Sequence, residues 1–282
     1  MTPAIPTNTL VSFYYYPRYD IDRLASTTII GDSGAFSAIM QGATIETPQL
    51  VAWAHQWRHR LAWIACLDVH GDPLATRRNW QEMCDGGIPG VPSIHCGEPV
   101  TEVDWYAERG VDFMGLGGLA GGGSMTPDVQ FRWLIQVFKH AEKNFPQMRF
   151  HGWGITRPKF QRLPFFSVDS SGWGAAYRYA RLALRHPHTG KTIGVAMNGK
   201  DVYKPEVALL LRDHYGVNPS QVATSGPHNR LLMVELCAKS AAIQEQQWRY
   251  LYRRKPISVP TWGQLGSPHT TPRPAPAPGR GA

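Results

Sequence analysis

The fold is decided by a repeating unit that is clearest in residues 62–95, AWIACLDVHGDPLATRRNWQEMCDGGIPGVPSIH. An apolar run, Ala62–Asp68, precedes a stretch with apolar residues at three- and four-residue intervals, Pro73–Asp85, and a second apolar run follows at Gly90–His95. The apolar runs predict buried strands, and the stretch between them predicts an amphipathic helix. Strands that alternate with helices pair in parallel, so this segment predicts a β-α-β unit.

The same alternation extends over most of the 282 residues. We expect strands at Leu10–Tyr15, Thr28–Asp32, Ala62–Asp68, Gly90–His95, Phe113–Gly117, Arg149–Gly154, Phe165–Asp169 and Ile193–Met197. We expect helices at Thr47–Arg60, Pro73–Asp85, Thr126–Asn144, Gly174–Arg185, Lys204–Tyr215 and Asn229–Arg253. Eight strand-helix units in about 250 residues predict a (β/α)8 TIM-type barrel. A doubly wound open sheet, which more often has about five or six strands, is the alternative.

Composition limits the domain organisation. We expect one barrel domain over residues 1–255, because a chain of this size usually supports one large core. Residues 256–282 contain seven prolines and no acidic residue, and they predict a disordered, mildly basic tail. The four cysteines are scattered and form no C-x-x-C pair, so we expect reduced, buried thiols without a disulfide scaffold or a zinc site.

Charge and hydropathy limit the partners. The chain has 29 Lys and Arg against 21 Asp and Glu, a formal net charge of +8, which favours a polyanionic partner. No apolar run approaches the roughly 20 residues that span a bilayer, and the N-terminal residues lack the pattern of a signal peptide. We therefore expect no membrane partner and a cytoplasmic location.

Carboxylates follow three of the expected strands. Asp32, Asp68 and Asp169 stand where apolar runs end, and active sites of (β/α)8 barrels lie at the carboxyl ends of the strands. A carboxylate there can act as a nucleophile, as a general base, or as a hydrogen-bond partner of a ring N–H. The alternative is that these residues are ordinary helix N-caps and turn residues.

Glycine and basic residues suggest a flat, anionic ligand. The glycine-rich stretch at 115–123 lets the backbone approach a flat ligand closely, although a loop without any ligand is the alternative. It matches neither the Walker nor the dinucleotide pattern, so we expect no nucleotide cofactor. Residues 149–191 hold eight basic residues around one acid, Asp169, a field that suits a phosphodiester backbone. The alternative is a solvated basic helix face. The expected nucleic-acid contacts are Arg157, Lys159, Arg162, Arg178 and Arg181.

The strand-end carboxylates and the glycine-rich stretch, in their order along the chain, resemble the motifs of the tRNA-guanine transglycosylases. They also resemble those of the family's phage and bacterial relatives that act on DNA, the DpdA-type DNA-guanine transglycosylases. The resemblance covers Thr28 to Gly174. The segment Asp32-Ser33-Gly34-Ala35-Phe36 is similar to the family's DSGGF/Y signature, and Leu67-Asp68 to a later strand-end Asp. Gly117-Gly118-Leu119-Ala120 is similar to the GGLA loop, and residues 151–158 to the MGVGTP strand and loop. Asp169 stands where the family has its nucleophile, but the residues after it depart from the family's LPTR.

The resemblance implies a base-exchanging pentosyltransferase. We expect no cofactor and no metal, because a covalent ester and a proton shuttle suffice for such an exchange. It implies that Asp169 is the nucleophile and Asp32 the general acid/base. It also implies that the base contacts Ser33, Phe36, Asp68, His95, Gly117, Gly118, Leu119 and Trp153, although His95 stands where the family usually has Gln.

The implied reaction exchanges guanine in DNA for a 7-deazaguanine, such as 7-cyano-7-deazaguanine, a modification that would protect phage DNA from restriction. If the enzyme is phage-encoded, the implied location is the host cytoplasm. The family's C-x-C-x-x-C zinc motif is missing, which favours DNA over tRNA as the substrate. The alternatives are a zinc-less tRNA-guanine transglycosylase and a catalytically inactive nucleic-acid-binding barrel. The oligomeric state stays open, with a homodimer as one option.

Overall fold

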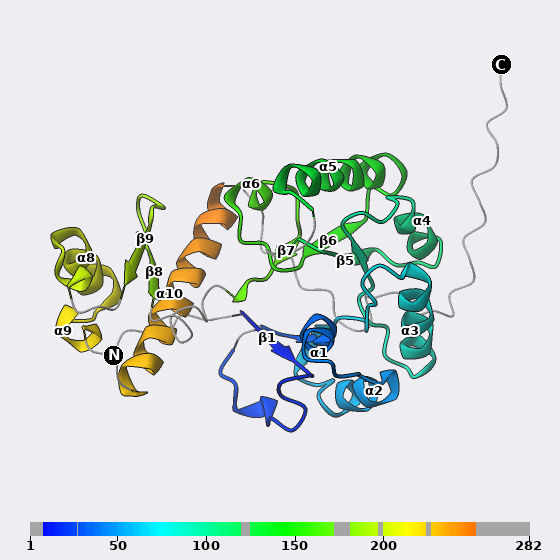
Figure 1. The fold of residues 1–282 in the computed structure, drawn as a ribbon, viewed down its shortest axis with the longest axis horizontal. Helices are drawn as coiled ribbons and strands as arrows, with labels where there is room; N and C mark the ends of the chain where they lie inside the picture. The colour runs from blue at the N-terminus through cyan, green and yellow to red at the C-terminus, as the bar shows by residue number, and fades with distance from the viewer. Residues whose placement is uncertain are drawn as a thin grey trace, which may run out of the picture. The chain divides into compact units, whose positions relative to one another are not determined.

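The computed structural model describes residues 8–26, 28–119, 125–171, 181–196, 200–223 and 227–251 (Figure 1). The chain divides into two compact units. The first, which we call the sheet unit, contains Thr9–Leu24 and Thr28–Asp169. The second, which we call the hairpin unit, contains the described residues from Ser170 to Leu251.

The sheet unit is built on strands that are hydrogen-bonded in chain order, β1-β2-β3 and β4-β5-β6-β7. Two backbone hydrogen bonds join these sheets, from Val91 N–H to Ile64 O and from Cys66 N–H to Val91 O, both 2.8 Å. The pairs β2/β3, β4/β5, β5/β6 and β6/β7 are all parallel. The strands are β1 (Asn8–Ser12), β2 (Thr28–Asp32), β3 (Leu61–Ile64), β4 (Ser93–His95), β5 (Phe113–Gly117), β6 (Arg149–Gly152) and β7 (Ser167–Val168).

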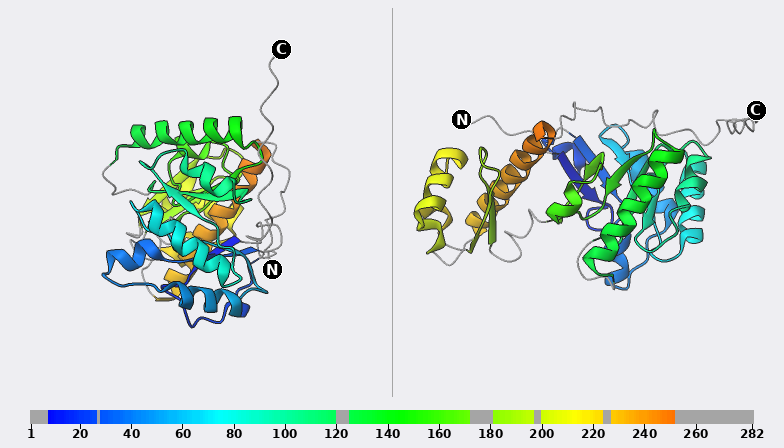
Figure 2. Two further views of the ribbon diagram at one scale, coloured as in Figure 1. Left: turned by 90° about the vertical axis from the view of Figure 1, so that its right-hand side faces the viewer. Right: turned by 90° about the horizontal axis from the view of Figure 1, so that it is seen from above.

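Helices connect the successive strands of the sheet unit, and α2 to α5 follow one another in an arc outside the strands (Figures 1 and 2). Proline in the first turn and a side-chain cap begin the two longest, α3 and α5. The Asp72 carboxylate accepts Ala75 N–H at 2.9 Å at the start of α3. The helices are α1 (Ala35–Met40), α2 (Thr47–Gln56), α3 (Pro73–Asp85), α4 (Glu102–Ala107), α5 (Pro127–Asn144) and α6 (Pro158–Gln161), with a 3-10 turn at Ile21–Arg23.

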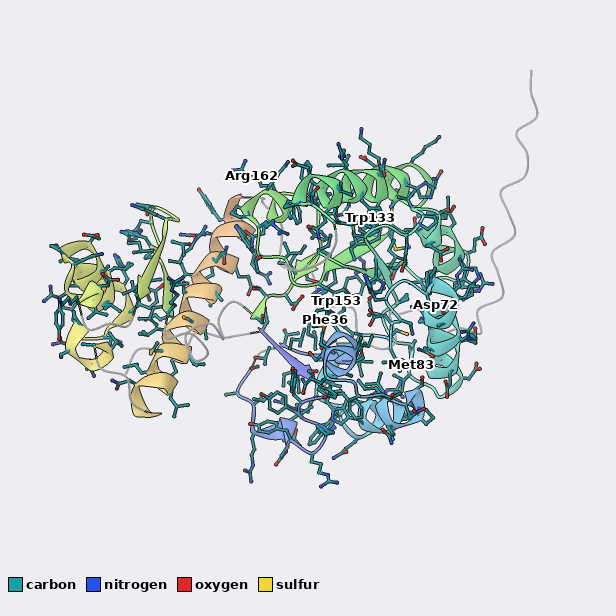
Figure 3. All side chains as sticks on the ribbon, in the orientation of Figure 1. Phe36, Asp72, Met83, Trp133, Trp153 and Arg162 are labelled. Atoms are coloured by element: carbon teal, nitrogen blue, oxygen red, sulfur yellow. The ribbon has the colours of Figure 1, made fainter. Side chains whose placement is uncertain are left out.

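The two faces of this sheet differ. Side chains of β5 point alternately to the two faces. Met114 and Leu116 belong to the large core between strands and helices. Phe113, on the other face, belongs to a smaller cluster with Trp63 and Val91. Trp153 packs against that smaller cluster. Figure 3 shows Trp133 extending from α5 toward the strands and Trp153 inside the arc of helices. The face of the sheet away from the helices is therefore lined by aromatic side chains, and its polar residues form the candidate site.

The hairpin unit has its own core. Strands β8 (Arg181–Arg185) and β9 (Thr192–Ala196) pair antiparallel, and α10 (Pro227–Leu251) lies along β8. The buried hydroxyl of Tyr215 accepts Arg185 N–H and donates to Arg185 O, both at 2.9 Å, which ties the hairpin to the helical part. The remaining elements are a 3-10 turn (Asp201–Tyr203), α8 (Pro205–Leu210), a π-helical turn (Leu211–Tyr215) and α9 (Pro219–Val222).

The prediction of an α/β fold with parallel strands is confirmed, and no closed barrel is detected among the described residues. The predicted helix Gly174–Arg185 is wrong over Arg181–Arg185, which form β8 because Leu182 and Leu184 are buried at a spacing of two. The predicted strand Ile193–Met197 overlaps β9, but β9 pairs antiparallel with β8 and not in parallel after β7. Residues 1–255, expected as one domain, include parts of both units.

Several local predictions are confirmed. Thr28–Asp32, Phe113–Gly117 and Pro73–Asp85 have the predicted bounds. All four cysteines are free and buried. The predicted tail at 256–282 lies outside the described residues. No helix in the described ranges has both the length and the apolar character that crossing a membrane requires.

Candidate active site

Three carboxylates converge at the carboxyl ends of the parallel strands. Asp32 is the last residue of β2, Asp68 follows β3, and Asp169 follows β7. The charges of Asp68 and Asp169 both act on Asp32, so the three groups share one site. Of the alternative that they are helix N-caps and turn residues, the first half does not hold for Asp32 or Asp68, because Gly34 precedes α1 and the side chain of Asp72 caps α3. Asp32 does act in a turn, since its carboxyl accepts the Gly34 N–H.

Asp32 is set up to carry a proton. Burial raises the pKa of its carboxyl from 3.8 to about 7; the Gly34 N–H opposes this shift, and the negative charges of Asp68 and Asp169 add to it. Gly34 has a left-handed φ of 79°, and a Cβ built there would lie 2.4 Å from Tyr14 Cβ, so this turn requires glycine. A carboxyl with a pKa near 7 can both donate and accept a proton at neutral pH.

Asp68 is held by a buried histidine. Its Oδ2 accepts from His95 Nε2 at 2.6 Å, and His95 Nδ1 donates to Glu98 Oε1 at 3.2 Å. Burial lowers the pKa of His95, but the hydrogen bonds with the two carboxylates outweigh it and raise the pKa from 6.5 to about 9. The ring is therefore a cation at neutral pH with both nitrogens engaged. The sequence placed His95 on a base edge, whereas its ring nitrogens are already bonded within the protein.

Asp169 lies beside a second buried histidine. Its Oδ1 accepts Gly154 N–H at 2.7 Å, and His151 Nε2 lies 3.5 Å from the same oxygen. His151 Nδ1 is 2.8 Å from Ser167 Oγ, while the buried Nε2 has no hydrogen-bond partner. His151 was not among the expected site residues, although it begins the segment 151–158 that is similar to the MGVGTP strand and loop. Its position two residues before Trp153 on an expected strand was the available signal, because it puts both rings on one face.

Aromatic rings surround His151. Its ring centroid lies 4.3 Å from that of Trp153 and 5.1 Å from that of Trp63. The indole N–H of Trp153 donates to Ser93 Oγ at 2.9 Å, so this tryptophan has a fixed orientation. The site thus combines three carboxylates with the partly exposed indole of Trp153, a flat surface that suits a planar ligand.

The other residues expected to contact the base differ in burial and in their contacts within the protein. Gly117 lies under His95, since a Cβ there would be 2.7 Å from His95 Cδ2. Gly118 lies next to it and accepts Gln130 Nε2–H through its carbonyl at 3.0 Å. Ser33 and Leu119 are buried, and Leu119 belongs to the main core. Phe36 is 71% exposed on α1.

The expected nucleic-acid contacts have different environments. Arg157 donates to Leu119 O at 3.3 Å and to Gln130 Oε1 at 3.1 Å, so it holds the segment after β5. Lys159 forms an ion pair with Asp128 at 3.2 Å, and Arg162 is exposed beside α6 (Figure 3). Arg181 is exposed on β8 of the hairpin unit, and Arg178 lies outside the described residues.

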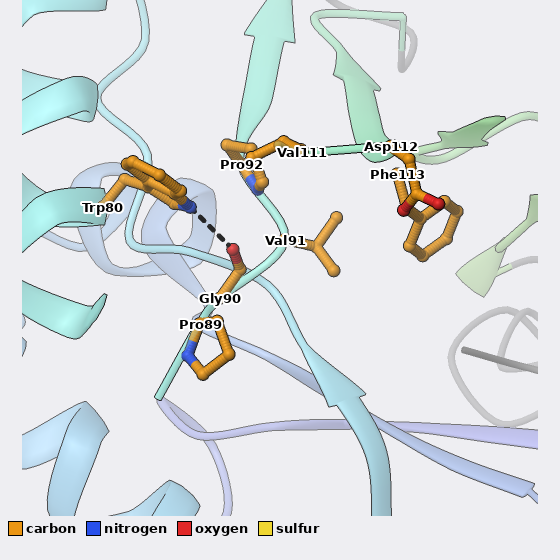
Figure 4. Close-up of a pocket in the computed structure, with 8 residues that line it drawn as sticks. All are labelled: Trp80, Pro89, Gly90, Val91, Pro92, Val111, Asp112 and Phe113. Atoms are coloured by element: carbon orange, nitrogen blue, oxygen red, sulfur yellow. Dashed lines mark hydrogen bonds between the residues drawn. The ribbon is translucent and has the colours of Figure 1, made fainter. Parts of the chain in front are cut away.

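A small pocket lies at the opposite edge of the sheet (Figure 4). It is lined near the amino ends of β4 and β5 by Pro92 and Asp112, and Trp80 Nε1 donates across it to Gly90 O at 3.0 Å. The carboxylates follow the carboxyl ends of their strands, so this pocket is separate from the candidate site.

No family model, curated protein or solved structure matches this chain. In the part of the chain that the structure describes, no group of three or more His, Cys, Asp and Glu side chains could hold a metal ion.

Proposed function

We propose that this chain is a DNA-guanine transglycosylase that exchanges guanine in DNA for a 7-deazaguanine, 7-cyano-7-deazaguanine or a close relative. The observation that supports this most is the convergence of Asp32, Asp68 and Asp169 on one site, where Asp32 has a pKa of about 7. The formal net charge of +8 supports a nucleic-acid substrate. We also propose a (β/α)8 TIM-type barrel, supported by strands in chain order with helices outside them.

In the proposed reaction, the Asp169 carboxylate attacks C1′ of a deoxyguanosine and the C1′–N9 bond breaks. The departing guanine takes the bonding electrons, and a proton from Asp32 neutralises it. A covalent deoxyribosyl ester on Asp169 remains, formed through an oxocarbenium-like transition state as in retaining glycosidases. The raised pKa of Asp32 supports this role, because much of the carboxyl is protonated at neutral pH.

The second half of the reaction reverses these roles. The incoming 7-deazaguanine loses its N9 proton to Asp32 and attacks C1′ from the face that guanine left, which releases the Asp169 carboxylate and retains configuration. Asp68 and the backbone at Gly117 and Gly118 would hold the base edge. The target base must leave the helical stack, which costs a few kcal/mol in a duplex, and the face of Trp153 offers a surface against which a flat base could pack.

Labelled guanine tests this function. The protein is incubated with labelled guanine and either duplex DNA or bulk tRNA. We expect the label to enter the DNA and not the tRNA. Asp169→Asn should abolish both exchange and a denaturation-resistant protein-DNA adduct, because an amide cannot form the ester. Asp85→Asn, at the exposed end of α3, is the matched control and should exchange normally. Label in tRNA alone would favour the RNA enzyme, and label in neither polymer would favour an inactive binding protein.

A further inference from the structure

The proposed reaction uses Asp68 but leaves unexplained the two buried ionisable side chains behind it. Glu98 is anchored twice to His95: its Oε1 accepts from Nδ1 at 3.2 Å, and its Oε2 accepts the His95 backbone N–H at 3.1 Å. Only 6% of the His95 side chain and 8% of the Glu98 side chain are exposed, against 23% of the Asp68 side chain. The row of charges therefore runs from the interior to the more accessible carboxylate.

The surrounding structure fixes this row in place. Trp133 Nε1 donates to the Glu98 carbonyl at 2.9 Å, and the Glu98 backbone N–H donates to His95 O at 2.9 Å. Gly117 leaves room for the imidazole. Burying two carboxylates and one cation is unfavourable unless each is paired, and no catalytic step described above needs Glu98. We therefore look for the role of the buried His95–Glu98 pair in its effect on the Asp68 carboxylate.

We propose that His95 and Glu98 are positioning residues, which hold the Asp68 carboxylate in one orientation as a pure hydrogen-bond acceptor and so make the site select a base edge that carries N–H donors. This inference rests on the proposed function for its choice of ligand. A guanine-type edge offers the N1–H and the 2-amino group side by side, whereas adenine offers an acceptor at N1. Glu98 accepts the hydrogen bond from His95 Nδ1. The other ring nitrogen, Nε2, therefore carries a hydrogen that it donates to Asp68, and it cannot itself accept a hydrogen bond.

Other titratable groups face this row and could contribute to its pH dependence. His70 lies with its ring centroid 4.9 Å from that of His95. The remaining groups are Asp32 on β2, Cys66 after β3, Cys96 beside His95 and Tyr106 on α4. Because burial raises the pKa of the Cys66, Cys96 and Tyr106 side chains, these three stay neutral near pH 7.

The first test needs no enzymatic activity. NMR titration of the histidine rings of the full chain, with His95 assigned by the loss of its signals in His95→Gln, should show His95 titrating at about pH 9. In Glu98→Gln the midpoint should fall by at least about one pH unit, since one ion pair is lost. A His95 midpoint near 6.5 in the unmodified chain would overturn the inference, and that measurement does not depend on a variant that folds.

The second test concerns selectivity. In exchange assays with guanine and with hypoxanthine, which lacks the 2-amino group, the unmodified chain should prefer guanine, by about tenfold or more in kcat/KM. Glu98→Gln should reduce that preference mainly through the KM for guanine, and a preference left unchanged would overturn the inference. Absence of exchange by the unmodified chain, together with a His95 midpoint near 9, would reject the proposed function and leave the positioning of Asp68 intact.

Discussion

Asparagine in place of Asp32 is expected to stabilise the protein at neutral and alkaline pH. The folded chain raises the pKa of this carboxyl from 3.8 to about 7, mainly by burial, so ionising it costs more in the folded state than in the unfolded state. At about 1.4 kcal/mol for each pH unit, the difference reaches about 4 kcal/mol as an upper value. The stabilising contribution of the protonated carboxyl is complete below pH 3.8 and is lost as the pH rises to about 7.

Urea unfolding at several pH values measures this effect. Asp32→Asn cannot ionise, so its free energy of unfolding should exceed that of the unmodified chain by about 2–4 kcal/mol at pH 8, and the gap should shrink toward pH 4.5. Asp85→Asn, at the exposed end of α3, is the control and should show no such trend. A gap that is constant with pH, or an Asp32→Asn variant less stable at pH 8, would refute the reasoning.

Two further substitutions test the packing of the two units. Gly117→Ala would place a Cβ 2.7 Å from His95 Cδ2 and should lower the free energy of unfolding by about 1–3 kcal/mol, whereas Gly194→Ala, with no atom within 4 Å, should change it by less than about 0.5 kcal/mol. Equal effects of the two alanines in thermal or urea unfolding would contradict this account of β5. Tyr215→Phe removes the hydroxyl that accepts Arg185 N–H and donates to Arg185 O, and it should lower the free energy of unfolding in urea by about 1–3 kcal/mol. Arg185 N–H keeps a second acceptor, Ser240 Oγ at 2.9 Å, so the loss falls mainly on Arg185 O. A Tyr215→Phe variant as stable as the unmodified chain would contradict this account.

Local sequence patterns were enough to find most of the sheet unit. The residues of α3 repeat apolar positions at helical spacing after an Asp72 cap and Pro73, and β5 is a short apolar run between polar segments, so each had a clear start and end. Asp32, Asp68 and Asp169 were also identified, because strand ends can be located along the chain before the strands are paired.

The hairpin unit and the contacts within the site could not be predicted in this way. Residues 181–185, RLALR, fit a helix as well as a strand, and only their pairing with β9 makes them a strand. The partners of His95 and His151 depend on which strands become neighbours and which face each ring takes. That is decided by tertiary packing across β4, β5 and β6, which a single sequence does not record.

The missing side chain at Gly117 has an evolutionary consequence. Since the imidazole of His95 occupies the volume that a Cβ at position 117 would need, the two positions should change together among homologues. A homologue with alanine or serine at the position of Gly117 should have a smaller residue at the position of His95, and it should then have lost the acid at the position of Glu98 as well. Correlated substitution at these three positions would mark which homologues keep the proposed selection of a base edge.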